Sequence, residues 1–126
     1  MAERALEVLL GGGHDRRAAR LSDVRVESLL LDLADVAESR GEVLTGPVAR
    51  LLAYDAKNNT RLVDSLRAWL EAFGDVPTAS AAVFVHPNTF RYRLSRIREV
   101  SGLDLRDPDE RFAAMLQLRV LAARSR

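Results

Sequence analysis

The sequence predicts an all-α fold, and three features of its 126 residues support this class. Apolar residues recur three or four positions apart over most of the chain, which is the period of one helix face. Residues that start or end helices (Asp, Asn, Pro and Gly) fall at the edges of these periodic stretches. Strict apolar–polar alternation occurs at Val24-Arg25-Val26, which is too short to predict a strand.

The first third of the chain is expected to hold two helices around a polar connection. The expected order is a short helix over residues 2–10, a flexible connection over 11–20 that contains Gly11-Gly12-Gly13, and a helix over about 26–40. Gly41 stands where a helix C-cap is expected. We place the domain boundary in residues 41–47, which separates an N-terminal helical segment (1–46) from a second domain (47–126).

Five further helices are expected in the second domain. They cover about residues 47–54, 60–73, 76–83, 87–100 and a last stretch that begins after Asp107. Asn59 or Thr60 is expected to cap the second of these helices. Asp75 is expected to cap the third and His86 the fourth, and each is followed by a proline in the first helical turn.

The 60–73 helix is expected to pack through an apolar stripe. The residues of this stripe are Leu62, Val63, Leu66, Trp69, Leu70 and Phe73. Gly74 is expected to end the helix. Asp107 and Glu110 have the spacing of a capping box, in which the glutamate accepts a hydrogen bond from the cap's own N–H.

The composition is that of an ordinary globular protein and excludes several classes. The chain is 48% hydrophobic and 29% charged, with a formal net charge of +1, which argues against disorder. Because it has no cysteine, it has no disulfide, thiolate nucleophile or cysteine-ligated metal. No apolar run is long enough to span a membrane, and the first ten residues lack the apolar stretch of a signal peptide. We therefore expect a cytoplasmic protein.

Basic residues gather in the C-terminal part of the chain, although the two charges almost balance overall. Residues 1–74 carry 10 basic and 12 acidic side chains, whereas residues 75–126 carry 9 and 6. Residues 86–98 hold four arginines and no acid. Two short helices joined by a break around Val85, the second of them basic, are typical of a helix-turn-helix.

The expected 87–100 helix has one apolar and one polar face. At 100° per residue, Phe90, Leu94 and Ile97 fall within a sector of about 60°. The opposite face is polar and holds no carboxylate until Glu99. Arginine can bond guanine in a bidentate manner, asparagine can bond adenine, and hydroxyls bond base edges or phosphates. This face therefore predicts binding to double-stranded DNA.

Helical geometry assigns two roles on this helix, because the residues opposite the stripe face the bases and those at its sides face phosphates. The candidates for base contacts are Asn88, Arg91, Tyr92 and Ser95. The candidates for phosphate contacts are Thr89, Arg93, Arg96 and Arg98. The expected partner is double-stranded DNA, and no cofactor, metal ion or catalytic residue is predicted.

Residues 86–94 resemble a run in a known family. They read His-Pro-Asn-Thr-Phe-Arg-Tyr-Arg-Leu, which is similar to the His-Arg-Asn-Thr-Leu-Arg-Tyr-Arg-Leu run of PucR-type (CdaR-like) bacterial transcription regulators. Similar flanks are Leu-Leu-Ala-Tyr-Asp at 51–55, the helix over 62–70 and Ser-Gly-Leu-Asp-Leu at 101–105. The resemblance covers about residues 47–121 and departs from the family at Pro87, where arginine is usual, and at Ser80 and Val83.

This resemblance implies a C-terminal, Fis-like helix-turn-helix DNA-binding domain of a bacterial transcriptional regulator. In such regulators the domain follows a GGDEF-like domain and a variable sensory region. Residues 1–46 would then be the tail of that upstream region, and a small-molecule effector would be bound upstream of this chain.

Two further hypotheses concern the partners. The first is a helical protein-interaction module whose basic helix binds an acidic protein; a steep salt dependence of DNA affinity would separate the two interpretations. The second is a homodimer, because helix-turn-helix proteins commonly bind paired half-sites. The leucine-rich residues 26–40 are the expected dimer interface.

Other polar residues favour structural roles over chemistry. His14 and His86 lack a second ligand at metal-binding spacing. Asp32, Asp35 and Glu38 share one helix face and indicate a solvated surface. No serine, threonine or acid stands in a nucleophile motif, so the chain is not expected to be an enzyme.

Overall fold

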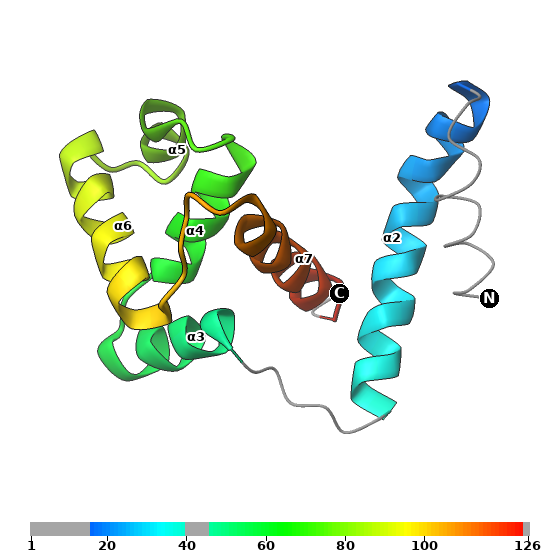
Figure 1. Cartoon of the computed structure of the whole chain (residues 1–126), viewed down its shortest axis with the longest axis horizontal. Helices are drawn as coiled ribbons and strands as arrows, with labels where there is room; N and C mark the ends of the chain where they lie inside the picture. The colour runs from blue at the N-terminus through cyan, green and yellow to red at the C-terminus, as the bar shows by residue number, and fades with distance from the viewer. Residues whose placement is uncertain (1–15, 40–45, 125–126) are drawn as a thin grey trace. The chain divides into compact units, whose positions relative to one another are not determined.

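The computed structural model describes residues 16–39 and 46–124, and within these ranges it contains six helices and no strand. The helices are α2 (Arg16–Ser39), α3 (Pro47–Asn58), α4 (Leu62–Glu71), α5 (Val76–Ala82), α6 (Pro87–Ser101) and α7 (Pro108–Arg124) (Figure 1). The prediction of an all-α fold is confirmed. The expected helix over 2–10, the glycine run over 11–13 and the Gly41 cap lie outside the described residues.

Contacts between residues divide the chain into two units, and the division falls inside α7. Among the described residues, the first unit contains α2 and residues 119–124, and the second contains residues 46–118. In the first unit Ala34 of α2 is buried, whereas Val26 and Leu33 on the same helix are exposed.

The helix α2 begins earlier than predicted. Residues 16–20 were expected in a flexible connection, but α2 starts at Arg16 and also includes Val24-Arg25-Val26. No glycine or proline occurs in residues 14–40, and alanine and arginine, which fill residues 16–20, have high helix propensity. The helix therefore extends to the N-terminal side of its periodic apolar residues.

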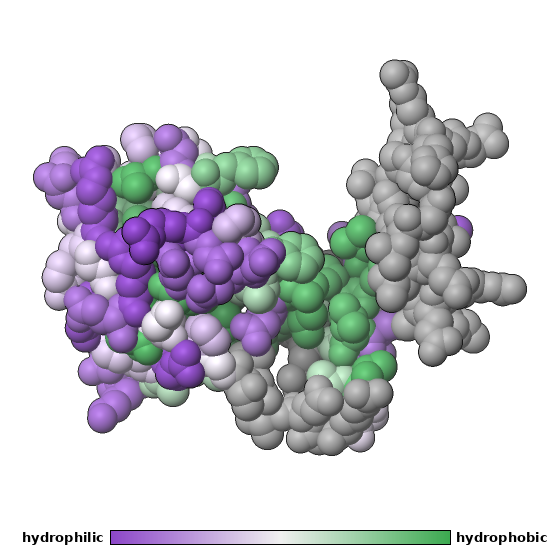
Figure 2. Space-filling view, in the orientation of Figure 1, coloured by the Kyte–Doolittle hydropathy of each residue, from purple (hydrophilic) through white to green (hydrophobic). Residues whose placement is uncertain are grey.

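The second unit is organised around three mutually contacting helices. α4, α5 and α6 all contact one another, and α3 contacts α4 and α6. Each helix contributes fully or almost fully buried side chains to the core: Val48 and Leu51 of α3, Leu66 of α4, Ala79 of α5, Phe90 and Ile97 of α6, and Ala114 and Leu118 of α7. Figure 2 shows mostly hydrophilic residues over the part of this unit that holds α6.

The predicted apolar stripe of α4 is correct except at its end. Leu62, Leu66 and Trp69 are buried as expected, together with Val63 and Leu70, but Phe73 is 95% exposed. The helix ends at Glu71, and Phe73 has a φ of 54°, in the left-handed region. Because helical spacing no longer applies after Glu71, the prediction that Phe73 belongs to the core is wrong.

The start of α4 is stabilised by a residue of the preceding helix. Asn59 or Thr60 was expected as the cap, but the N-cap residue is Arg61, whose side chain makes no capping hydrogen bond. Instead, Asp55 of α3 accepts hydrogen bonds from the backbone N–H groups of Leu62 (2.8 Å) and Val63 (2.9 Å). α3 continues to Asn58, four residues beyond its predicted end, and this extension carries Asp55 to the first turn of α4.

The other predicted caps are mostly confirmed. Asp75 is the N-cap of α5 and accepts from the Thr78 N–H at 3.0 Å. Asp107 accepts from the Asp109 N–H at 2.9 Å, but Glu110 does not complete the reciprocal box. The Asp107 N–H is already bonded to the Asp104 carbonyl. The Glu110 carboxylate therefore accepts from the Asp104 N–H instead, at 3.1 Å.

Candidate nucleic-acid interface

The helix α6 packs through the apolar stripe predicted from its sequence. Phe90, Leu94 and Ile97 are buried, and α6 contacts α3, α4 and α5. Its N-cap is His86, whose Nδ1 accepts a hydrogen bond from the Asn88 N–H at 3.0 Å. The helix is therefore fixed along one side and at its start, and its polar face is left toward solvent.

The C-terminal end of α6 is held by α3. The Arg50 side chain donates two hydrogen bonds to the Ser101 carbonyl, from Nε at 3.1 Å and from Nη2 at 2.5 Å. Gly102 follows with a φ of 77°, a left-handed conformation that glycine adopts without strain. Arg50 satisfies a carbonyl that a helix end leaves without an intrahelical partner, so α3 is part of the support of α6.

The predicted base-contacting residues lie on the outer face of α6. Asn88, Arg91 and Tyr92 are exposed, and Ser95 is half-buried. The Arg91 Nη1 donates to the Asn88 Oδ1 at 3.0 Å. Arginine and asparagine are thus side by side at the start of the helix, the end that helix-turn-helix proteins direct at base edges.

The predicted phosphate-contacting residues divide between the two sides of α6. Thr89, Arg93 and Arg96 lie on the side that faces α3 and the start of α4, where they line one surface depression with Tyr92. Arg98 is exposed on the other side, and its Nη2 lies 3.4 Å from the Ser95 Oγ.

Arg96 is held by Tyr54 of α3, a residue that was not predicted as part of the site. Its Nη2 donates to the Tyr54 hydroxyl at 2.6 Å, and its guanidinium lies over the Tyr54 ring, 5.3 Å from the centroid. Its Nη1 donates to Glu99 Oε2 at 2.7 Å. The hydrogen bond to Tyr54, and after it the one to Glu99, raises the pKa of Arg96 above its ordinary value.

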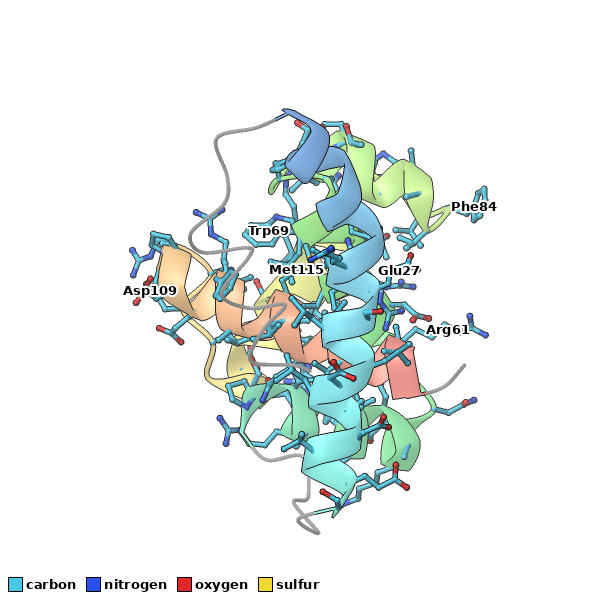
Figure 3. The ribbon with its side chains drawn as sticks, turned by 90° about the vertical axis from the view of Figure 1, so that its right-hand side faces the viewer. Glu27, Arg61, Trp69, Phe84, Asp109 and Met115 are labelled. Atoms are coloured by element: carbon cyan, nitrogen blue, oxygen red, sulfur yellow. The ribbon has the colours of Figure 1, made fainter. Side chains whose placement is uncertain are left out.

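The α3–α6 depression has a volume of about 510 Å³. It is lined by Tyr54, Asn59, Thr60, Arg61, Leu62, Thr89, Tyr92, Arg93 and Arg96. Besides the apolar Leu62, four polar residues of this lining (Tyr54, Asn59, Thr60 and Arg61) were not predicted as site residues. They come from α3 and the α3–α4 loop, and no local pattern indicates that this loop lies beside α6. Figure 3 shows the Arg61 side chain extending away from the ribbon.

The described residues offer no sign of two other kinds of site. They contain no group of three or more His, Asp or Glu side chains that could hold a metal ion. None of their helices combines the length and the apolar character needed to cross a membrane.

A short helix, a tight turn and a second helix with one buried and one polar face define a helix-turn-helix domain. In this chain α5, the turn around Phe84 and α6 have this arrangement. Residues 62–120 match the PucR C-terminal helix-turn-helix domain family. This part of the chain is a PucR-type helix-turn-helix domain, as its sequence predicted.

Three relatives are similar to the chain over little more than half of its length. The DNA-binding transcriptional activator AdeR of Bacillus subtilis is 32% identical over 58% of this chain and 17% of its own length. The carbohydrate diacid regulator of Escherichia coli is 40% identical over 61% of this chain and 20% of its own. The proline-responsive transcriptional activator PutR of B. subtilis is 31% identical over 59% and 18%. The chain thus spans about a fifth of each relative, and no solved structure is significantly similar to it.

Proposed function

We propose that this chain binds double-stranded DNA through α6 and is the DNA-binding part of a bacterial transcriptional regulator in the cytoplasm. The observation that carries the proposal is the polar face of α6: residues 86–98 contain four arginines and no acid, and their apolar stripe is buried. The PucR-type domain and the names of the similar regulators support the same function.

The roles follow from the position of each side chain around α6. We assign base contacts to Asn88, Tyr92 and Ser95, which lie opposite the buried stripe, and to Arg91, which is hydrogen-bonded to Asn88 at the start of the helix. We assign phosphate contacts to the lateral residues Thr89, Arg93, Arg96 and Arg98. A helix of about 10–12 Å diameter fills a major groove of about 12 Å, so its sides meet the phosphate backbones.

Further proposals concern the N-terminal residues, a small-molecule effector and a homodimer. Residues 1–46 are proposed as a segment separate from the domain over 47–126, and as the end of an upstream region that binds any small-molecule effector. A homodimer through residues 26–40 is supported by the exposed aliphatic side chains of Val26, Leu33 and Val36.

Fluorescence anisotropy of labelled random-sequence duplex DNA tests the proposal. With four phosphate contacts, a rise from about 50 to about 200 mM salt should weaken binding about a hundredfold. The variant Arg91→Ala/Arg98→Ala removes two exposed arginines. Its affinity for DNA at low salt should be at least about tenfold lower than that of the wild type. Arg106→Ala, an exposed arginine outside α6, is the control and should bind like the wild type.

The alternative function has a different outcome in the same experiment. If α6 binds an acidic protein instead of DNA, the anisotropy should stay flat at low salt for the wild type and for a chain dimerised artificially. Flat titrations of both proteins would therefore favour the protein-interaction module over DNA binding.

A further inference from the structure

We propose that the α3–α6 depression is a phosphate-binding site of the interface, in which the α3–α4 loop completes the contacts made by α6. The ligand is a phosphodiester group of the DNA backbone that runs along this side of the helix. This inference rests on the proposed function, and it adds to the interface a loop that lies outside the helix-turn-helix itself.

The lining of the depression suits a phosphate. It contains three guanidinium groups, those of Arg61, Arg93 and Arg96, and its described lining includes no acid. The hydroxyl groups of Thr89 and Tyr92 add hydrogen-bond donors for phosphate oxygens. Arginine is the preferred residue for phosphates because its planar fork can donate two parallel hydrogen bonds.

A neighbouring depression has a lining that is less suited to a phosphate. It has a similar volume of about 560 Å³ and lies between α4 and the turn at Phe84. Arg61, Arg67 and Arg93 border this depression, but Asp64 and Glu71 are also part of its lining and offset two of the three positive charges. The two carboxylates would repel a phosphate there, so we assign the ligand to the α3–α6 depression.

Two acids outside the lining already pair with its arginines: Glu99 accepts from Arg96 at 2.7 Å, and Asp64 lies 3.9 Å from Arg61. Both carboxylates are exposed to solvent (62% and 51%), so a phosphate can share these guanidinium groups with them. A third acid, Asp55, is engaged by its own partners. Asp55 is half-buried and accepts from two N–H groups of α4 and from the Thr60 hydroxyl, the last at 2.6 Å. Carboxylates at the start of a helix are stabilised by its dipole. Asp55 therefore joins Thr60 of the loop to the first turn of α4.

The position of the depression agrees with the docking of a helix in the major groove. Thr89, Arg93 and Arg96 all lie on the side of α6 that borders the loop. This side must face one phosphate backbone when the outer face meets the bases. Arg61, whose side chain is 82% exposed, is then the loop residue best placed to reach that backbone.

The variant Arg61→Ala tests the site, with Arg106→Ala as a matched control. Both arginines are exposed (82% and 93%), and each lies near one aspartate, Arg61 3.9 Å from Asp64 and Arg106 3.3 Å from Asp104. A phosphate contact that releases one counterion contributes about eightfold to the affinity at 0.1 M salt. Arg61→Ala should therefore bind random duplex DNA about eightfold more weakly, with a salt slope smaller by about 1. Arg106→Ala should match the wild type, and Arg61→Lys should restore the slope.

The outcomes separate this inference from the proposed function. If the wild type does not bind DNA, the proposed function fails; if it binds and Arg61→Ala equals Arg106→Ala, the site in the depression is refuted. A titration with inorganic phosphate distinguishes the source of the ligand. Saturable phosphate binding that is lost in Arg61→Ala, without any loss of DNA affinity, would overturn the assignment to the DNA backbone.

Discussion

The two sides of α6 carry similar residues, yet they are held differently. On the side of the α3–α6 depression, Arg96 is bonded to Tyr54, and the Arg93 Nη1 donates to Ser65 of α4 at 3.2 Å. On the other side, the hydrogen bonds of Arg91 and Arg98 are to Asn88 and Ser95 of the same helix. Arg93 and Arg96 are half-buried, whereas Arg91 and Arg98 are exposed.

The difference assigns different tasks to the two sides. A side chain that is ordered before binding loses less conformational freedom when it meets the DNA, and each such loss costs about 0.5–1.5 kcal/mol. The held arginines can therefore fix the position of α6 against one backbone. Arg91 and Arg98 are exposed and bond to residues of their own helix, so more of their conformational freedom remains to be lost when they meet a base or a phosphate.

The largest expected effect on stability comes from truncating Phe90 in the buried stripe of α6, which supports both sides of the helix. Phe90→Ala leaves a cavity at a fully buried position and should lower the free energy of unfolding by about 3–5 kcal/mol. Phe73→Ala is the matched control, because it deletes the same side chain at a position that is 95% exposed. It should change the free energy by less than about 0.5 kcal/mol.

Urea denaturation followed by circular dichroism measures both variants. If both variants lost the same free energy of unfolding, Phe73 would be packed in solution and the contrast between a buried Phe90 and an exposed Phe73 would be wrong. An affinity for DNA that falls together with the stability of Phe90→Ala would show that both sides of α6 depend on this stripe.

A smaller effect distinguishes the held side from the free side. Tyr54→Phe removes the hydroxyl that accepts from Arg96 but keeps the ring beneath its guanidinium. The affinity for DNA should fall about threefold, since Arg96 must then be ordered on binding. The salt slope should stay unchanged because no charge is lost, which separates this positioning role from the phosphate contact of Arg61.

Anisotropy titrations in a double-mutant cycle with Arg96→Ala check this prediction. In the Arg96→Ala background, Tyr54→Phe should have no further effect on DNA affinity. A full threefold loss in that background would mean that Tyr54 acts on its own and does not position Arg96.

The contrast between local and distant contacts also explains what the sequence could predict. The stripe of Phe90, Leu94 and Ile97 and the caps Asp75 and His86 depend on residues within a few positions of one another, and all were predicted correctly. Phe73 failed because the helical period was extended beyond the residue at which α4 ends.

The missed part of the site depends on pairs that are far apart in the chain. Tyr54 and Arg96 are separated by 42 residues, and Arg93 and Ser65 by 28. Helical spacing places Arg93 and Arg96 on one side of α6, but it does not reveal which segment packs beside them. Asp55 shows the same limit, because its role at the start of α4 follows from the path of the α3–α4 loop.

The smallest expected effect on stability concerns the N-cap residues of α5 and α6, Asp75 and His86. The hydrogen bond from the Thr78 side chain, and after it the one from the Thr78 backbone, lowers the pKa of Asp75 below its ordinary value. A carboxyl whose pKa is lower in the folded than in the unfolded state stabilises the fold above its unfolded pKa of about 3.9. This contribution is lost as the pH falls through the folded pKa.

Asp75→Asn should therefore be slightly less stable than the wild type at pH 7, and this difference should shrink as the pH falls below about 3.9, as measured by urea denaturation from pH 7 to pH 3. Part of the acid sensitivity should persist in the variant, because hydrogen bonds from the backbone and side chain of Arg106 also lower the pKa of Asp104. His86→Asn is the comparison at the cap of α6, since asparagine retains an acceptor for the Asn88 N–H. A stability difference between Asp75→Asn and wild type that stayed constant from pH 7 to pH 3 would mean that the carboxylate charge of Asp75 contributes nothing to the cap of α5.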